Sequence, residues 1–466
     1  MLKVRCLVLS LFLGALAGPD LAQAEEVAVG IAAVDITPPR GYRMAGYFNE
    51  RTNTGTKDPL FAKAIVFRQE DRRAALIFCD LIAMPQEISS NARSLIAERC
   101  KIPVENVAIC ATHSHTGPLF YGVLRKHFHE RAIEKNGKDV LEEVDYPAKL
   151  VESLVEAVVK AQAALAPTKL AAGIAQEDRL AFNRRFHLKD GRVVFNPGLL
   201  NPNIAKVAGP IDPDVGLISF AEPDGKTPKG ILTVYALHLD TVSGTEYSAD
   251  YPHFLDEAIK KALGPDVQSL FGTGTCGDIN HIDVKTTTVR KAAEIGGELA
   301  RTVLAKLPSL EPIAAPSLDV ARAVVEVPTQ TVKADEVAKS RSQLDLVGDP
   351  KLAFLDAVRT VTVVDLADNY PKGTVPLEVQ AFRLSPDVAI VTLPGEVFVE
   401  IGMAIKKASP FKTTLVIELA NDIPSYVPTK KAFSEGSYEI VNSRVLPGGG
   451  EAMADAAIGL LKKLAR

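Results

Sequence analysis

The stretch ATHSHTGP, residues 111–118, follows directly on the strand-like run at residues 106–110. A short apolar run that ends in a polar turn containing glycine and proline is typical of a buried strand. In an extended segment, residues i and i+2 point to the same side, so we expect His113 and His115 to reach one centre. Neutral imidazole is a common ligand of zinc. The same pair is also compatible with two hydrogen-bonded polar residues in a loop.

The alternation of apolar run, polar turn and helical periodicity recurs along the chain. It predicts strands at residues 74–78, 231–237, 267–271, 388–393 and 413–419, and helices at residues 86–98, 146–165, 286–307, 397–407 and 451–464. The segment 309–376 is less regular: we expect a strand at 318–327 and helix over 334–368 with a break at 348–350, and the segment is a candidate insertion. The pattern predicts an α/β fold, with a mixed β-sheet core flanked by helices in a single large catalytic domain over residues 25–466.

The composition excludes several classes of protein. The 466 residues carry 53 basic and 57 acidic side chains, a net charge of −4, and 47% of them are hydrophobic. A disordered chain would have fewer apolar residues and a larger charge imbalance. A nucleic-acid-binding protein would have an excess of basic residues. Trp is absent and aromatic residues make up 6%, which argues against a site built for stacking on sugars.

Residues 1–24 have the pattern of an export signal. Lys3 and Arg5 precede a short apolar run, and the chain then reaches the small-x-small sequence that ends at Ala24. We therefore expect cleavage near Ala24 and export to the periplasm or outside the cell. No later stretch is apolar for long enough to predict a transmembrane helix. In the oxidising compartment a Cys79–Cys110 disulfide is conceivable, and buried free thiols are the alternative.

Further chemically active residues also follow predicted strands. His238 lies at the end of the run 231–237, Asp278 follows 267–271, Glu396 follows 388–393, and Tyr426 comes soon after 413–419. Side chains beyond the carboxyl ends of strands converge in sheets with helical crossovers, so we expect one site. Each residue also has a structural interpretation: His238 as a core histidine, Glu396 as an acidic residue at a helix start, and Tyr426 as a half-buried amphipathic side chain.

Asp240 and the other histidines are weaker candidates for the site. Asp240 is a candidate carboxylate to orient the His238 ring, and it is equally compatible with a turn residue. His281 follows Gly277-Asp278 closely and is a candidate acid/base or supporting residue. We expect His127 and His129 on a solvated helical face, and His187 in a hairpin turn. His253 is expected at a helix start.

Taken in order, these motifs resemble the neutral/alkaline non-lysosomal ceramidase family, zinc-dependent amidases that cleave the N-acyl bond of ceramide. The similar segments extend over residues 30–445 and are GIAAVDITP (30–38), MAGY (44–47), LFAKA (60–64), ATHSHTGP (111–118), NR (183–184), SADYP (248–252), CGDI (276–279) and LPGE (393–396). The histidine stretch is the most specific of them. Tyr426 and Tyr438 are similar to the two active-site tyrosines of the family.

The resemblance implies one zinc ion per chain, held by His113, His238, Glu396 and Tyr426. It implies that a metal-activated water attacks an amide carbonyl, with His115 placed to assist the oxyanion or the leaving nitrogen. Tyr438 and Arg184 are then candidates to hold polar groups of the substrate, and Tyr438 is also a candidate catalytic residue. The implied partner is a small-molecule or lipid amide, with transient contact to a membrane surface.

Two departures from the family bear on the substrate. Where the family continues Gly-Asp-Val with an active-site Ser, this sequence has Asn280, whose amide can donate to an oxyanion but supplies no hydroxyl. The C-terminal immunoglobulin-like sandwich of larger members has no counterpart, so we expect the catalytic domain only. Two alternatives remain. Gly277-Asp278 close to Asn280-His281 is compatible with a metallophosphoesterase-like hydrolase, and the replacement of the Ser by Asn280 is compatible with a secreted ligand-binding homologue without catalytic activity.

Overall fold

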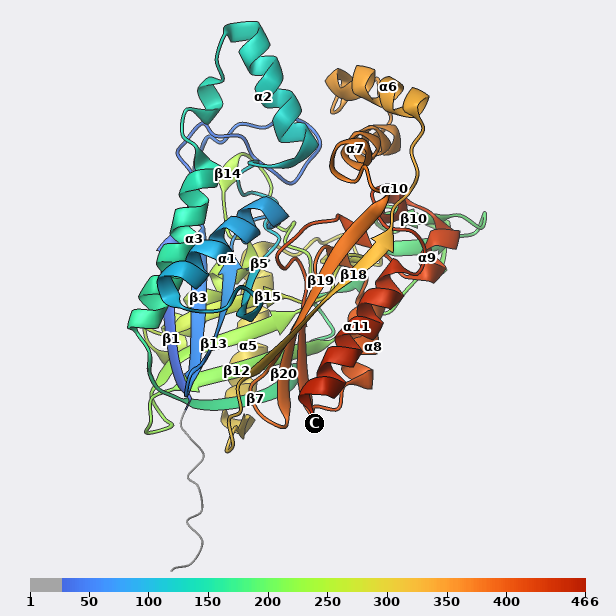
Figure 1. Cartoon of the computed structure of the whole chain (residues 1–466). Helices are drawn as coiled ribbons and strands as arrows, with labels where there is room; N and C mark the ends of the chain where they lie inside the picture. The colour runs from blue at the N-terminus through green and yellow to red at the C-terminus, as the bar shows by residue number, and fades with distance from the viewer. Residues whose placement is uncertain (1–26) are drawn as a thin grey trace, which may run out of the picture.

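The computed structural model describes residues 27–466 (Figure 1). The predicted export signal at residues 1–24 lies outside the described residues. The chain forms mixed sheets with helices packed on them, which confirms the predicted α/β fold class. None of the helices in this described part is long and apolar enough to cross a membrane.

Three larger sheets organise the molecule, and each contains one pair of neighbouring parallel strands among antiparallel ones. In spatial order, the first sheet comprises β5 (Val107–Ala111), β4 (Arg72–Cys79), β3 (Phe61–Gln69), β1 (Ala28–Asp35) and β6 (Ala166–Pro167). The second comprises β15 (Gln268–Thr273), β13 (Pro228–Tyr235), β12 (Asp214–Ala221), β7 (Lys169–Gln176) and β17 (Glu311–Pro312). The third comprises β18 (Asp319–Pro328), β19 (Thr374–Arg383), β20 (Val388–Thr392) and β22 (Thr413–Ile417).

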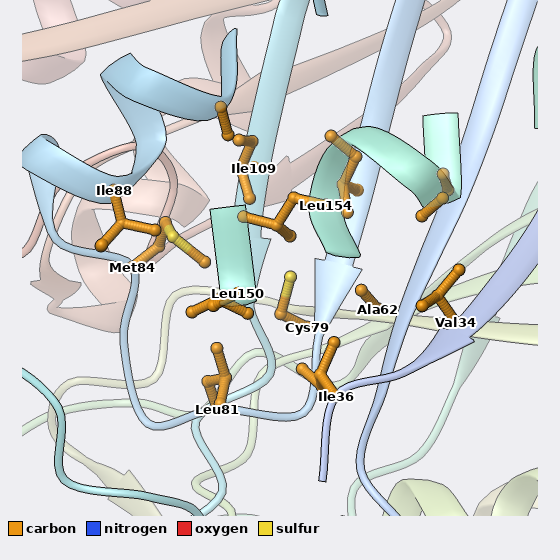
Figure 2. Close-up of a cluster of buried hydrophobic side chains, with 14 of the residues drawn as sticks. Val34, Ile36, Ala62, Cys79, Leu81, Met84, Ile88, Ile109, Leu150 and Leu154 are labelled. Carbon is orange, nitrogen blue, oxygen red and sulfur yellow. The ribbon is translucent and has the colours of Figure 1, made fainter. Parts of the chain in front are cut away.

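The helices cover one face of each large sheet, while the opposite faces meet in a shared core. The helices are α1 (Gln86–Cys100), α2 (Gly122–Asn136), α3 (Tyr146–Ala163), α4 (Tyr251–Leu263), α5 (Ala292–Lys306), α6 (Ala334–Gln343), α7 (Phe354–Asn369), α8 (Val399–Ala408), α9 (Lys430–Glu435), α10 (Tyr438–Val441) and α11 (Gly449–Leu464). Helices α1 and α3 pack on the first sheet, α4 and α5 on the second, and α8 and α11 on the third. Figure 2 shows Leu150 and Leu154 of α3 in the same apolar cluster as Cys79 and Ile109 of the first sheet.

The alternation of side chains along β4 shows why this packing forms. Residues 75, 77 and 79 belong to the cluster beneath α1 and α3, whereas residues 74, 76 and 78 belong to the shared core between the sheets. Successive side chains of a strand point to opposite faces, so a continuous apolar run buries both. The shared core also contains Leu232 of the second sheet and Ile390 of the third.

Short strands and 3₁₀ turns lie within the connections between the larger strands and helices. They are β2 (Gly55–Thr56), β8 (Phe182–Asn183), β9 (Arg185–Leu188), β10 (Val193–Phe195), β11 (Ile204–Val207), β14 (Glu246–Tyr247), β16 (Ile279–Asn280), β21 (Glu396–Val397), β23 (Tyr426–Val427), and the 3₁₀ turns Val104–Asn106, Val140–Glu142, Leu307–Ser309 and Leu344–Leu346. Helices α2 and α7 contact each other, with α6 beside α7 at the top of Figure 1. An apolar cluster that includes Val123, Leu124, Val347 and Ala357 lies between them.

Several predicted boundaries are wrong in detail. Glu396 lies in the short strand β21 rather than at a helix start, because α8 begins only at Val399. Helix α5 begins at Ala292, six residues later than expected. The segment 309–376 is not an insertion as a whole: its strand β18 pairs with β19 inside the third sheet, and only the connection through α6 and α7 projects from it.

The four cysteines of the described chain are free and buried. Cys79 and Cys110 do lie on the neighbouring strands β4 and β5, as expected, but no disulfide joins them. Burial raises the pKa of both thiols, which is consistent with their role as small apolar side chains of the core.

Candidate metal centre

Residues that follow the parallel strand pairs of all three large sheets converge at one place. His113 comes after β5, His238 after β13, and Glu396 after β20. The Nε2 atoms of His113 and His238 are 3.1 Å apart. Glu396 Oε2 lies 3.3 Å from His113 Nε2 and 3.5 Å from His238 Nε2. The structure therefore brings together three side chains separated by up to 283 positions in the sequence, and their role as metal ligands stays a prediction.

His115 belongs to the same cluster, with its Nε2 atom 3.4 Å from that of His113. The ligand atoms of His113, His115 and His238 all lie within 4.8 Å of one another. The extended backbone that we expected here is wrong, since His113 has φ of 80°. A residue other than glycine rarely adopts this left-handed conformation, and such strain is often found at functional sites.

The hydrogen bonds of the three rings determine where their protons lie. The Nδ1 atoms contact backbone carbonyl oxygens: His113 that of Ile82 at 2.7 Å, His115 that of Gly46 at 3.1 Å, and His238 that of Cys276 at 3.0 Å. A carbonyl oxygen only accepts, so each neutral ring carries its proton on Nδ1 and presents a lone pair on Nε2 to the cluster.

These lone pairs meet an unpartnered carboxylate oxygen. Glu396 Oε2 is buried and has no hydrogen-bond partner. Two imidazole lone pairs and a carboxylate oxygen at about van der Waals distance repel each other unless positive charge lies among them. A divalent metal ion supplies that charge, and neutral imidazole with carboxylate is a donor set that zinc accepts. The residues present therefore fit a zinc ion.

The electrostatics of the cluster point the same way. Burial opposes ionisation of Glu396, but the neighbouring His113 and His238 lower its pKa well below the usual range, so the carboxyl group is ionised at neutral pH. Burial, together with His113, lowers the pKa of His115 to about 3. Burial and the nearby Arg184 lower the pKa of His238. Neutral rings at His115 and His238 beside an ionised Glu396 are protonation states that metal binding requires.

Arg184 supports the centre from the side of Tyr426. Its guanidinium donates to the Tyr426 hydroxyl at 3.0 Å and to the Gly277 carbonyl at 2.9 Å, and Nη1 lies 3.3 Å from His238 Nε2. The buried Glu439 accepts from Arg184 Nε at 2.9 Å and balances its charge. These contacts are all internal to the protein, so the structure shows Arg184 as a support of the centre. Its role in holding substrate stays a prediction.

Tyr426 is paired with Glu396 in the parallel bridge between β21 and β23, so the two residues lie side by side on neighbouring strands. Burial raises the pKa of Tyr426 well above its usual value, with Arg184 opposing the shift. Without a cation the phenol therefore stays protonated. A metal ion beside it would favour release of that proton.

Tyr438 connects Tyr426 to an aromatic surface. Its ring lies 5.4 Å from that of Tyr426, 4.7 Å from Phe195 and 5.5 Å from Phe354, between ring centroids. Phe354, the first residue of α7, is 48% exposed. We call Phe195, Phe354 and Tyr438 the aromatic shelf. These rings extend from the candidate metal centre to the surface. Because Phe354 belongs to α7, the α6–α7 connection lies beside the site.

Two other predicted residues have partners that the sequence did not reveal. Asn280 donates from its amide to Asn196 at 2.7 Å and accepts from the Ile282 amide at 3.0 Å, so its side chain holds the surrounding loops together. The suggestion that Asp240 orients His238 is wrong: Asp240 instead contacts His281 Nδ1 at 3.1 Å.

Sequence reasoning missed two buried acidic residues, Glu418 and Glu439, both 0% exposed. Glu418 directly follows the fully buried strand β22. A lone acidic residue at the end of an apolar run is a detectable signal, because buried carboxyl groups are rare unless they are paired.

Comparison with known proteins agrees with this geometry. Residues 27–248 match the family model of the neutral/alkaline non-lysosomal ceramidase, N-terminal region. No curated protein sequence matches the chain.

The crystal structure of neutral ceramidase from Pseudomonas aeruginosa is similar in fold, with a TM-score of 0.69 and 18% identity over 95% of this chain and 75% of that chain. A structure of ceramidase complexed with C2 is similar with the same TM-score and identity, over 94% of this chain and 75% of that one. At this level of identity the similarity shows a shared fold. The resemblance to the neutral/alkaline non-lysosomal ceramidase family is thus confirmed, by the family model over residues 27–248 and by the fold over nearly the whole chain.

Proposed function

We propose that this protein is a ceramidase-like, zinc-dependent hydrolase that cleaves the N-acyl bond of a lipid amide. The observation that carries the proposal is the cluster of inward-facing imidazole Nε2 atoms around the unpartnered Oε2 of Glu396. The family match supports the reaction class. Because the ligands come from strands on both sides of the chain's midpoint, we treat residues 25–466 as one catalytic unit.

His113, His238, Glu396 and Tyr426 would hold one zinc ion per chain. When bound, zinc supplies a Lewis acid for the carbonyl oxygen and lowers the pKa of a water towards about 7. The backbone carbonyls that accept from the Nδ1 atoms of His113 and His238 keep these rings in the ligating tautomer, which is the usual function of such outer contacts.

We assign the proton transfer of the reaction to His115. Its Nδ1 proton is held on the Gly46 carbonyl, and its neutral Nε2 faces the cluster. In this tautomer the ring starts as a base: it accepts a proton from the attacking water and returns it to the leaving nitrogen. The proton returned to the leaving nitrogen is the assistance that the family resemblance implies for His115, and the hydrogen bond to Gly46 means that Nε2 must first take up that proton.

The aromatic shelf supports an apolar substrate group. Its rings continue from Tyr426 to the half-exposed Phe354, and Leu355 beside it is 42% exposed. An alkyl chain laid on these rings would bury apolar surface that water now contacts. An N-acyl sphingoid lipid is the substrate class that the family implies, and the same exposed residues suit brief contact with a lipid surface.

Metal analysis and a substrate panel test the proposal. We expect one zinc per chain in the purified protein, loss of zinc and turnover in His238→Ala, and neither loss in the control His253→Ala, a half-exposed histidine of α4. The panel contains N-acyl sphingosines, N-acyl amino acids and simple esters. Retention of zinc by His238→Ala would show that the ligand assignment is wrong.

Other outcomes would favour the alternatives. Two metal ions per chain with phosphodiester cleavage would indicate a metallophosphoesterase. Lipid binding without turnover at any pH would indicate a ligand-binding homologue. Export is a separate part of the proposal, supported by the sequence pattern of residues 1–24, and N-terminal sequencing of protein expressed in bacteria should find a start close to residue 25.

A further inference from the structure

Glu418 occupies an unusual position for a carboxyl group. It is 0% exposed and follows the last residue of β22, a strand whose five residues are all buried. Its backbone amide donates to the Thr273 carbonyl at 2.9 Å, which joins the ends of β22 and β15. An isolated buried carboxyl group is costly, so its presence requires specific partners.

Both carboxyl oxygens of Glu418 have such partners. Oε2 accepts from the Val397 amide at 2.6 Å, and Oε1 accepts from the Cys276 thiol at 3.1 Å. Val397 is the residue after Glu396, and Cys276 is the residue whose carbonyl accepts from His238 Nδ1. One side chain therefore contacts both segments that position the ligands of the second and third sheets.

The contact to Val397 fixes the peptide that follows Glu396. The Val397 amide belongs to that peptide plane, and the Glu396 amide on the other side donates to the Ser425 carbonyl at 2.9 Å. Because hydrogen bonds hold the backbone on both sides of Glu396, its side chain can move only by rotation about its own bonds. This is how its Oε2 can stay near two imidazoles without a partner of its own.

The contact to Cys276 fixes the carbonyl that orients His238. The Cys276 thiol also lies 3.5 Å from His238 Nδ1, and the Gly277 amide donates to the Val397 carbonyl at 2.9 Å. The loop after β15 and the strand β21 are thus joined twice, once directly and once through Glu418. A shift of either segment would move His238 and Glu396 relative to each other.

We propose that Glu418 is a positioning residue that holds His238 and Glu396 in register through Cys276 and Val397. The inference rests on the proposed metal centre and adds a residue that touches neither metal nor substrate. Carboxylates that support ligands from outside commonly change metal affinity by about 10- to 100-fold when they are removed.

Zinc affinity, measured by competition with a chelator, tests the proposal without any substrate. Glu418→Met keeps the length of the side chain and removes both acceptors, so we expect zinc to bind about 10- to 100-fold more weakly. Glu418→Gln retains an acceptor for the Val397 amide and should stay within about threefold of the unchanged protein, which separates hydrogen bonding from charge. Glu177→Met is the matched control: Glu177 follows β7, is 1% exposed and accepts from Arg179 and from Thr302 of α5, so its loss should leave zinc affinity unchanged.

Each result of the zinc-affinity measurements supports or overturns a defined part of the proposal. If the unchanged protein binds no zinc, the proposed function fails and this inference with it. If it binds zinc and a folded Glu418→Met binds equally tightly, only the positioning role is overturned. If Glu418→Met does not fold, Cys276→Ala decides, because it removes the thiol that donates to Glu418: weaker zinc binding supports the positioning role, and unchanged affinity in folded protein overturns it. Circular dichroism of the metal-free variants establishes which of them fold.

Discussion

Asp80 provides a quantitative test of the electrostatics beside the site. It follows β4, and its side chain accepts from the Phe61 amide at 2.9 Å and more weakly from the Thr112 hydroxyl at 3.5 Å. The nearest basic group, Lys63, is engaged by Asp256 and by the Ser269 carbonyl. Burial without a full counter-charge raises the pKa of Asp80 to about 6. We predict that Asp80→Asn, which removes the charge and keeps an acceptor, stabilises the protein at neutral pH.

The size and sign of the effect follow from proton linkage. The folded protein binds the Asp80 proton more tightly than the unfolded chain, whose pKa is 3.8. The associated stability is present below about pH 4 and is lost as the pH rises to about 6. A difference of about two pKa units corresponds to about 3 kcal/mol in the free energy of unfolding. Between pH 4.5 and 7.5 the advantage of Asp80→Asn over the unchanged protein should grow by about 2 kcal/mol.

Urea unfolding at pH 4.5, 5.5, 6.5 and 7.5 measures this difference. The exposed Asp266→Asn serves as the control, and its effect should stay within about 0.5 kcal/mol at every pH. A constant difference between Asp80→Asn and the unchanged protein across this range would refute the reasoning, since the charge of Asp80 would then cost nothing on folding.

Three further predictions concern the site. In Gly277→Ala the added Cβ would lie 2.6 Å from the Glu396 carbonyl oxygen. We therefore expect the free energy of unfolding in urea to fall by about 1–3 kcal/mol and zinc to bind more weakly. An unchanged free energy of unfolding and an unchanged zinc affinity would contradict the predicted clash. Phe354→Ala shortens the aromatic shelf and should raise KM for an N-acyl lipid several-fold while zinc content stays the same, whereas an unchanged KM would separate the shelf from the substrate. Glu439→Gln leaves Arg184 buried without its carboxylate and should lower the free energy of unfolding by about 3–5 kcal/mol in urea titrations; a loss below about 1 kcal/mol would show that the pair contributes little.

The amino-acid sequence alone was sufficient to predict the α/β class and most of the strands that carry the site. Buried strands such as β5, β20 and β22 are apolar runs that end in polar turns, and such local patterns are visible without tertiary information. The same reasoning predicted that His113, His238 and Glu396 would meet, because side chains after the carboxyl ends of strands share one edge of the fold.

The tertiary structure decided which partner each of these side chains has. His238 contacts the Cys276 carbonyl rather than Asp240, and the Asn280 amide donates to Asn196. In the sequence Glu418 is one polar residue at the end of an apolar run. Only the structure shows that its carboxyl group accepts hydrogen bonds from both Val397 and Cys276. Periodicity reports which face of a strand a residue occupies. Hydrogen-bond partners depend on how three separate sheets pack, and that packing brings together groups more than a hundred residues apart.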